Sequence, residues 1–483
     1  MDVPAFKKYT GDIKGETFMK LRRLLCGFLS AAILAVQPGA IVMADDTEEE
    51  IQSEAEARKQ AIYDTAPESN GIEGWPQGPN VYAASAVVMD MDTGAVLYEK
   101  KADERHYPAS ITKLLTVLVA LENMELTDTV LFSQASVDFL NYDDAQIGMK
   151  PGEELSMEDS LYAVLLASAN EVSYAVAEST GIALGGTYET FIEMMNHRSQ
   201  ELGCTGSHWV NPNGLHDDDH YTTAYDMALI ASAVYQEEEF RNIMKTLEYR
   251  IGFTNLTQEE RVFQQNHKML WPENYYYYEY CTGGKTGYTD QSGTTLVTMA
   301  ENGGMRLVAV VLQDYGVDAY TDTRAMFDYA FANFSKAAVP VEETSEQIKR
   351  FVQDEAYVDL PAGVSFSQLE QQIEQSGSVA ADRGIVKYLY QGQLLGKAEV
   401  VLDVVHFNKA AAKEEKKAAG TLTDENNKAD TSKIVKVLIM VLTVIVLLFF
   451  IYFLYVRYRR EQMRKRRNAR RRAARERKEK EYD

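Results

Sequence analysis

An uncharged apolar run near the C-terminal end constrains the topology of this chain more than any other feature. Residues 437–456 are twenty consecutive residues without a charge, which is enough to cross a bilayer as a helix. The segment that follows, residues 457–483, holds fourteen Lys/Arg and five Asp/Glu. Because positively charged flanks stay on the cytoplasmic side, we predict a transmembrane helix over 434–456 and a basic cytoplasmic tail over 457–483.

A second apolar segment, near the N-terminus, is typical of an export signal. From Met19 a basic stretch leads into an apolar run that ends in the small residues Val42 and Ala44. We predict a signal peptide over 19–44, with a retained helix as the alternative. Together the two segments predict a single-pass protein of the cell membrane whose main part lies outside the cytoplasm.

Charge and cysteine content exclude several classes of function. The net charge is -23 although the tail is basic, so the body of the chain is acidic and disfavours nucleic acid, whereas the tail suits an anionic membrane surface. Only three cysteines occur, without a C-x-x-C spacing or a zinc ligand set, so we predict no metal and no cofactor. His216 and His220 flank three aspartates, but they share one loop, and a metal site there is the weaker interpretation.

The residues between the two membrane signals predict an α+β domain. An acidic, polar segment over 45–79 is interpreted as a spacer. Short apolar strands are predicted near both ends of the following stretch and helices between them, which indicates an antiparallel sheet flanked by helices over 80–336. The predicted strands are 85–91, 95–99, 293–300 and 306–312, and the predicted helices are 111–123, 156–168 and 321–334.

The chain changes character after this domain. Strand-like segments at 357–360, 384–390 and 397–405 predict a small, mostly β domain over 337–408. Residues 409–433 are rich in Ala, Lys, Glu and Asp without apolar periodicity, which predicts a solvated, charged stalk before the membrane helix.

A serine and a lysine at the predicted start of the first long helix carry the main chemical signal. Ser110 and Lys113 are three residues apart, so their side chains share one face of a helix, and the lysine can act as the base for the serine hydroxyl. To accept a proton, Lys113 needs a pKa lowered from about 10.4 toward roughly 7 to 8 by burial or by a nearby cation.

Two further motifs support this interpretation. Ser168-Ala169-Asn170 interrupts an apolar helical segment, and Lys285-Thr286-Gly287 lies on a strand-like segment; each motif occurs once. Singly, the three motifs are explained equally well by a helix start, a helix cap and a turn. Their order along the chain, each on the expected element, favours a common catalytic site.

The ordered set Ser-x-x-Lys, Ser-x-Asn and Lys-Thr-Gly resembles the penicillin-recognising serine enzymes, with their β-lactamase/transpeptidase-like fold. Within that group the chain is similar to the low-molecular-mass penicillin-binding proteins that act as D-alanyl-D-alanine carboxypeptidases. The resemblance covers about residues 77–405 and includes residues 211–215 and the small β domain before a membrane anchor. The chain departs from the family pattern at Ala169, where glycine is usual, and in having an apolar segment long enough to span the membrane.

The resemblance implies a role for each matching residue. Ser110 would be the nucleophile and Lys113 its base, with Ser168 and Asn170 relaying protons and positioning substrate. Lys285 and Thr286 would bind the terminal carboxylate, beside the small Gly287. The backbone N–H groups of Ser110 and Tyr288 would form the oxyanion hole.

The implied partners are peptidoglycan stem peptides, β-lactam antibiotics as covalent inhibitors and the bacterial cytoplasmic membrane. A D,D-endopeptidase, a β-lactamase-like hydrolase and a non-catalytic wall-binding protein stay open as alternatives. Tyr275–278 with Tyr280 could line a groove beside the Lys-Thr-Gly strand, although packing on a sheet is the commoner role of such residues.

Overall fold

The computed structural model describes residues 48–353, 355–375 and 382–409. The predicted signal peptide, transmembrane helix and basic tail lie outside these residues, as does the predicted stalk beyond residue 409. Within the described ranges, no helix has the length and apolar character needed to span a membrane. The described residues divide into two compact units: the first comprises residues up to Ser335 together with Pro361–Gly363, and the second comprises the described residues of Lys336–Leu360 and of 364–409.

The first unit is built on a five-stranded sheet of order β2-β1-β9-β8-β7 in which every neighbouring pair is antiparallel. Gly303 and Gly304 join β8 to β9 with φ of 60° and 85°, values that suit a tight two-residue hairpin and that glycine adopts without strain. Strand β1 pairs with β9, so the strands β1 and β2 share one sheet with a hairpin, β8–β9, that comes much later in the chain. The five strands are β1 (Ser85–Asp90), β2 (Val96–Lys100), β7 (Cys281–Thr289), β8 (Gly293–Asn302) and β9 (Met305–Asp314).

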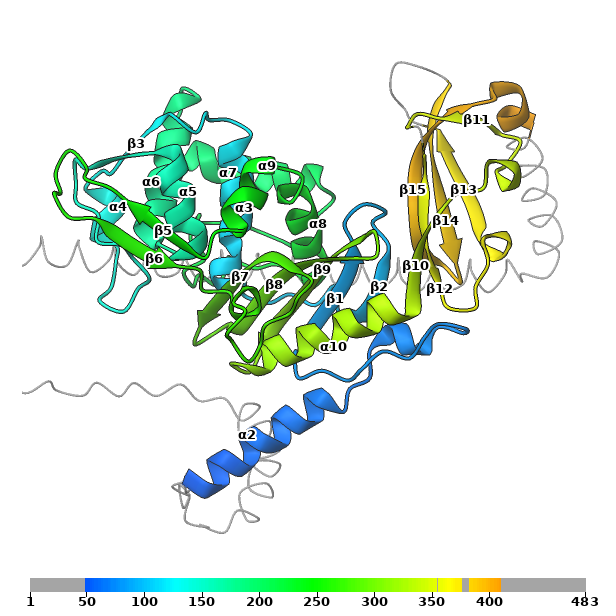
Figure 1. Cartoon of the computed structure of the whole chain (residues 1–483), viewed down its shortest axis with the longest axis horizontal. Coiled ribbons are helices and arrows are strands. Elements are labelled where there is room, and N and C mark those ends of the chain that lie inside the picture. The colour runs from blue at the N-terminus through cyan, green and yellow to red at the C-terminus, as the bar shows by residue number, and fades with distance from the viewer. Residues whose placement is uncertain (1–47, 354, 376–381, 410–483) are drawn as a thin grey trace, which may run out of the picture. The chain divides into compact units, whose positions relative to one another are not determined.

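Helices cover both faces of this sheet (Figure 1). Helix α10 (Asp318–Asn333) packs on β8 and β9 from one face, and α8 (Ala224–Val234) packs on β1 and β9 from the other. Helix α3 (Lys113–Leu121) is buried along nearly its whole length, as its apolar sequence predicts. The remaining helices of this unit's core region are α5 (Met157–Leu166), α6 (Asn170–Ala183), α7 (Tyr188–Glu201) and α9 (Glu238–Met244).

Local sequence signals explain several helix starts. Ser156 caps α5, because its hydroxyl accepts a hydrogen bond from the backbone N–H of Asp159 at 3.0 Å. The predicted helices and strands of this domain are present with shifts of a few residues at their ends, and the α+β architecture is as expected. Shorter elements complete the unit: η1 (Glu68–Gly71), η2 (Ala109–Thr112), β3 (Thr129–Leu131), α4 (Ala135–Asp138), β4 (Glu154–Ser156), β5 (Glu248–Ile251), β6 (Arg261–Gln264) and η3 (Lys268–Leu270).

The segment interpreted as a spacer has more structure than expected. It contains helix α2 (Glu48–Tyr63), and Lys59 of this helix forms an ion pair with Asp318. The buried ammonium group of Lys100 donates to the carbonyl oxygen of Ile62 at 2.8 Å, and Trp75 is only 4% exposed. The sequence of α2 is polar and has no strong apolar face, so its packing on the unit could not be read from periodicity.

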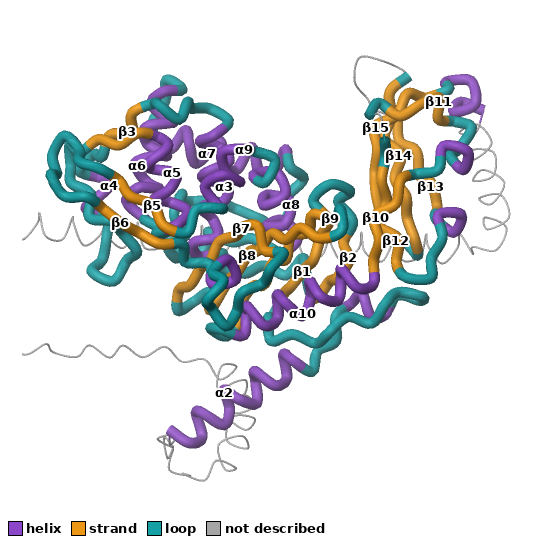
Figure 2. The backbone as a smooth tube through the Cα atoms, in the orientation of Figure 1, coloured by secondary structure: helices purple, strands orange, loops and turns teal. Residues whose placement is uncertain are grey.

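The second unit is mostly β, as predicted (Figure 2). Its main sheet has the order β11-β15-β14-β13 and is antiparallel throughout, and β10 pairs with β12 in a separate ribbon. Strand β15 begins and ends earlier than predicted, at Gln393 and Leu402. The bounds are β10 (Phe334–Ala338), η4 (Val341–Glu343), β11 (Ile348–Phe351), β12 (Tyr357–Pro361), η5 (Phe366–Gln368), β13 (Glu370–Gln375), β14 (Arg383–Tyr390) and β15 (Gln393–Leu402).

Candidate active site

Ser110 lies in a tight turn that leads into α3. The preceding residue, Ala109, has a φ of 51°, a left-handed conformation that non-glycine residues rarely adopt and that functional sites often contain. The Thr112 hydroxyl donates to the Ala109 carbonyl at 2.8 Å and so closes the turn. A Cβ on Gly214 would lie 1.9 Å from the same carbonyl oxygen, so residues 211–215 press directly against the serine-bearing turn.

Lys113 is fully buried one turn after Ser110. Its ammonium nitrogen lies 2.9 Å from the Ser110 hydroxyl, 2.7 Å from Asn170 Oδ1 and 2.6 Å from the Asn213 carbonyl oxygen. Burial, and next the positive charge of Lys285, hold the pKa of Lys113 well below its usual value. A lysine in this state can take the proton of the serine hydroxyl.

Ser168 and Asn170 lie between two helices, where α5 ends and α6 begins. Ser168 has a left-handed φ of 60°, which turns the chain sharply between the helices. Asn170 is the first residue of α6, and its backbone N–H donates to the Ala145 carbonyl at 2.8 Å. The two polar side chains are thereby directed at two different lysines, Asn170 at Lys113 and Ser168 at Lys285.

Lys285 lies on strand β7 and is also buried, with 1% of its surface exposed. Its ammonium group donates to the Ser168 hydroxyl and to the Thr286 carbonyl, both at 2.9 Å. Burial lowers the pKa of Lys285 to about 7. The ammonium group therefore lies against Ser168 and does not line the neighbouring cavity.

A cavity of about 380 Å³ opens beside these groups, and Ser110, Ser168, Thr286, Gly287 and Tyr288 are among the residues that line it. Gly287 is at the closest approach of β7 to the serine turn. A Cβ there would come 2.4 Å from Thr295 Oγ1 and 2.9 Å from the Ser110 backbone nitrogen. Only glycine fits this position without displacing one of the two elements.

The structure thus brings all eight sequence-predicted site residues to one place. Hydrogen bonds link Lys113 to Ser110 and Asn170, and a separate hydrogen bond links Lys285 to Ser168. Thr286, Gly287 and Tyr288 line the cavity with Ser110, and Tyr288 is 65% exposed.

Several residues of the site carry no clear signal in the sequence. The Asn213 carbonyl accepts from Lys113, and its place in the 211–215 segment is the only hint of that contact. Glu171 directly follows Asn170 and is buried; its Oε1 accepts from the Ile147 backbone N–H at 2.7 Å and holds the loop that carries Ala145 near the cavity. Lys268 lines the cavity from η3, and no motif singles it out.

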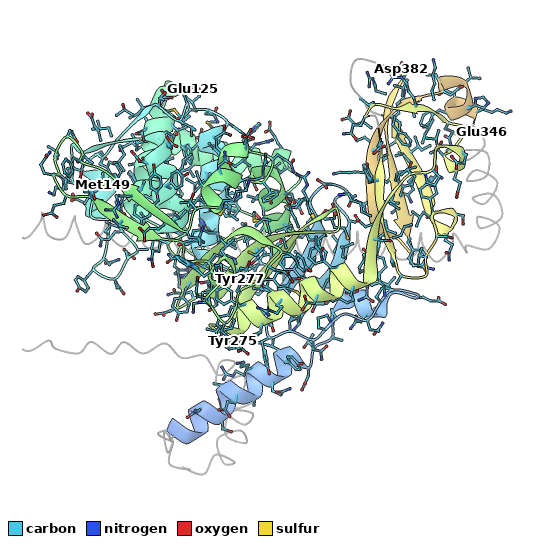
Figure 3. All side chains as sticks on the ribbon, in the orientation of Figure 1. Glu125, Met149, Tyr275, Tyr277, Glu346 and Asp382 are labelled. Carbon is cyan, nitrogen blue, oxygen red and sulfur yellow. The ribbon has the colours of Figure 1, made fainter. Side chains whose placement is uncertain are left out.

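The sequence also suggested a tyrosine-lined groove and left open a metal site and the state of the cysteines. Tyr278 is 6% exposed and stacks on Phe327 of α10, whereas Tyr275 is 87% exposed at the surface (Figure 3). Among the described residues no group of three or more His, Cys, Asp or Glu side chains could hold a metal ion. Both described cysteines, Cys204 and Cys281, are free thiols.

His220 is buried behind the serine turn. Its Nδ1 accepts from the Val210 backbone N–H at 3.1 Å, so its Nε2 carries the proton and donates to the Thr112 hydroxyl at 2.9 Å. Burial lowers the pKa of His220 to about 3, which keeps the ring neutral. This histidine is therefore a support of the serine turn.

Comparison with known proteins agrees with the geometry of the site. The sequence profile of a family described as D-alanyl-D-alanine carboxypeptidase matches residues 73–316. D-alanyl-D-alanine carboxypeptidase DacF of Bacillus subtilis is 30% identical over 361 residues, covering 71% of this chain and 87% of that protein. DacA of Haemophilus influenzae is 28% identical and covers 67% of this chain and 82% of its own length.

Among solved structures, the Streptomyces K15 DD-transpeptidase is 27% identical and covers 53% of this chain and 100% of its own, with a TM-score of 0.49. The matching family profile spans the serine turn and the Lys-Thr-Gly strand, and the DacF similarity extends well beyond it. The chain therefore belongs to the D-alanyl-D-alanine carboxypeptidase family of serine peptidases.

Proposed function

We propose that this enzyme removes the terminal D-Ala of peptidoglycan stem pentapeptides through an acyl-enzyme on Ser110, and that penicillins acylate the same serine. The observation that carries the proposal is the 2.9 Å contact between the Ser110 hydroxyl and the buried Lys113 ammonium group. A base with a lowered pKa in contact with a hydroxyl that lines a cavity is what covalent catalysis by serine requires.

The first half of the reaction is acylation. The Ser110 oxygen attacks the carbonyl carbon of the penultimate D-Ala while Lys113 takes the hydroxyl proton. The backbone N–H groups of Ser110 and Tyr288 stabilise the oxyanion, and Gly287 leaves room for the substrate beside β7. The peptide bond breaks as the leaving amine receives a proton through Ser168, which is bonded to Lys285, and free D-Ala departs.

Water then attacks the ester carbonyl and gives one proton to the Ser168–Lys285 pair, which replaces the proton that this pair gave to the leaving amine. The bond to Ser110 breaks, and the serine hydroxyl regains its proton from Lys113. Asn170 positions Lys113 through its 2.7 Å contact. Thr286, which lines the cavity, would bind the terminal carboxylate of the substrate, and Lys285 donates to the Thr286 carbonyl oxygen at 2.9 Å.

The test is intact-protein mass spectrometry after incubation with benzylpenicillin, together with an assay for D-Ala release from a pentapeptide. Wild-type protein should gain the mass of one drug molecule, and Ser110→Ala should gain none. The variant should also lose D-Ala release by at least about 10³-fold while its unfolding temperature stays near that of the wild type, because the hydroxyl serves chemistry and not packing. D-Ala release retained by Ser110→Ala would contradict the proposal.

The same assays separate the alternatives. Release of peptide from a cross-linked dimer in preference to D-Ala from the pentapeptide would indicate a D,D-endopeptidase. Rapid turnover of benzylpenicillin, in place of a persistent adduct, would indicate a β-lactamase-like hydrolase.

We also propose that the enzyme works outside the cytoplasm, attached to the cell membrane by residues 434–456, with its basic tail in the cytoplasm. The uncharged apolar run and the arginines after it support this orientation. Protease added to intact spheroplasts should digest the catalytic unit and spare an epitope on the tail. Protection of the catalytic unit would contradict this placement.

A further inference from the structure

Lys268 is the one charged residue among the described residues that line the cavity beside Ser110. The remaining lining residues are neutral, and the two lysines of the catalytic motifs are buried outside it. A single half-buried cation in an otherwise neutral cavity of about 380 Å³ attracts an anionic group of whatever ligand enters.

The Lys268 side chain is held in place without being neutralised. Its ammonium group lies 5.8 Å from the centroid of the Tyr276 ring and 5.7 Å from that of Tyr320, and these two rings stack with centroids 5.3 Å apart. Within the described part of the chain, no carboxylate forms an ion pair with Lys268, so its charge is available to a ligand.

The turn that carries Lys268 is fixed to the sheet. The preceding residue, His267, is 1% exposed, and its Nε2 lies 2.9 Å from the Thr298 hydroxyl on β8. A Cβ on Gly284 of β7 would come 2.7 Å from the same nitrogen, so the imidazole packs tightly against the strand that bears the Lys-Thr-Gly motif. Lys268 is thus anchored next to that strand.

Lys285 is poorly placed to meet a substrate anion directly. Its ammonium group is 1% exposed and already donates to the Ser168 hydroxyl and the Thr286 carbonyl. Burial also lowers the pKa of Lys285 to about 7, so it carries less than a full charge at neutral pH. The carboxylate of a D-Ala-D-Ala terminus, which is one residue beyond the scissile carbonyl, needs another cation in the cavity.

Resting on the proposed function, we propose that Lys268, together with Thr286, binds the C-terminal carboxylate of the substrate and the corresponding carboxylate of penicillins. Lys268 then determines specificity for a free C-terminus, while Lys285 serves the proton relay through Ser168. Lys268 therefore faces the ligand, whereas Lys285 faces a catalytic hydroxyl.

The experiment compares an N-acylated D-Ala-D-Ala peptide with its C-terminal amide, using the full chain and the variants Lys268→Met and Lys268→Arg. Lys268→Met should lower kcat/KM for the acid about 10- to 100-fold, the value of a charge-assisted hydrogen bond, and leave kcat/KM for the amide nearly unchanged. Lys268→Arg, which keeps the positive charge, should retain most of the wild-type preference for the acid.

The matched control is Lys336→Met. The Lys336 ammonium also lies over a tyrosine ring, 5.9 Å from the centroid of Tyr357, but it does not line the cavity. This variant should hydrolyse both substrates like the wild type. Equal losses for acid and amide in Lys268→Met, or no loss for either, would overturn the role of Lys268.

Acylation by benzylpenicillin gives a second readout. Its rate should fall in Lys268→Met, whereas the rate with the methyl ester of the drug should not. A wild-type protein that neither forms an adduct on Ser110 nor releases D-Ala would refute the proposed function itself, and the role of Lys268 with it. A wild type that does both, with an unchanged preference for the acid in Lys268→Met, refutes only the assignment to Lys268.

Discussion

Lys113 and Lys285 are two buried lysines that each donate a hydrogen bond of 2.9 Å to a serine hydroxyl, Ser110 and Ser168 respectively. Burial, and after it the charge of Lys285, lowers the pKa of Lys113, while the carboxylates of Glu171 and Asp144 oppose the shift. The protonation of the proposed base is therefore set partly by the second lysine, and this coupling can be tested.

Lys285→Met should move the acidic limb of the pH–rate profile upward. The variant removes a like charge from the surroundings of Lys113, so the pKa of Lys113 rises and the neutral base is present only at higher pH. Acylation by benzylpenicillin should therefore fall most at pH 6 to 7 and recover in part at alkaline pH. Lys285→Arg keeps the charge, and its acidic limb should stay at the wild-type position. A pH profile that is merely scaled down in Lys285→Met would contradict the coupling.

Asn170→Asp should also move the acidic limb of the pH–rate profile upward, because it places a negative charge beside Lys113. The amide oxygen of Asn170 accepts from Lys113 at 2.7 Å, and a carboxylate in its place would stabilise the ammonium form. We expect acylation at neutral pH to fall by about 10-fold or more, since one pKa unit changes the fraction of neutral lysine about tenfold. Asn170→Ala, which lacks the charge, is the control, and an upward shift of the limb in that variant as well would show that charge is not the cause.

Gly214→Ala should destabilise the protein and disable the serine turn. Gly214 has a φ of 83°, and a Cβ there would lie 1.9 Å from the Ala109 carbonyl oxygen. Gly185 is a matched control, because its φ is 81° and a Cβ there meets no atom within 4 Å. Gly185→Ala should cost only about 1 kcal/mol for the left-handed backbone, whereas Gly214→Ala adds a clash that displaces the turn. Thermal unfolding and penicillin acylation of both variants check this, and equal behaviour would refute it.

His220 should make the protein more sensitive to acid. Its pKa is about 3 in the folded state and about 6.5 when unfolded, so below pH 6.5 the unfolded chain binds a proton that the folded chain does not. Stability is lost as the pH falls, by about 2 kcal/mol between pH 7 and pH 5 from this residue. Urea unfolding at both pH values should show a smaller loss in His220→Gln than in the wild type.

The exposed His197 provides the control for this measurement. Comparison with His197→Gln, which removes an imidazole at the surface, separates the effect of burial from that of losing a histidine. A loss between pH 7 and pH 5 that is the same in His220→Gln and in the wild type would mean that the imidazole titrates normally in the folded state.

Much of the catalytic unit could be predicted because its signals are local. The mostly apolar sequence of α3 predicts burial, Ser156 caps α5, and Gly303-Gly304 joins two strands in a tight hairpin. The motif residues could also be placed on their elements, since each motif interrupts or begins a segment with a clear periodicity.

Other elements could not be predicted, because their stability comes from contacts with distant parts of the chain. Strand β13 has the polar sequence Glu370–Gln375 and is a strand only because it pairs with β14. Helix α2 lies in an acidic segment and is held by contacts such as that of Lys100 with the Ile62 carbonyl. The residues that stabilise β13 and α2 lie outside the stretches of sequence that form these two elements.

The sequence alone was enough to place the chain in its family, because three short motifs in a fixed order specify a serine hydroxyl, a lysine one turn along and their polar neighbours. What each lysine faces depends on the three-dimensional fold: Lys113 faces the serine, Lys285 faces a second hydroxyl, and Lys268 faces the cavity. Orientation, burial and pKa depend on side chains brought together from segments more than a hundred residues apart, such as Ser168 and Lys285, and such contacts have no local signature in a sequence.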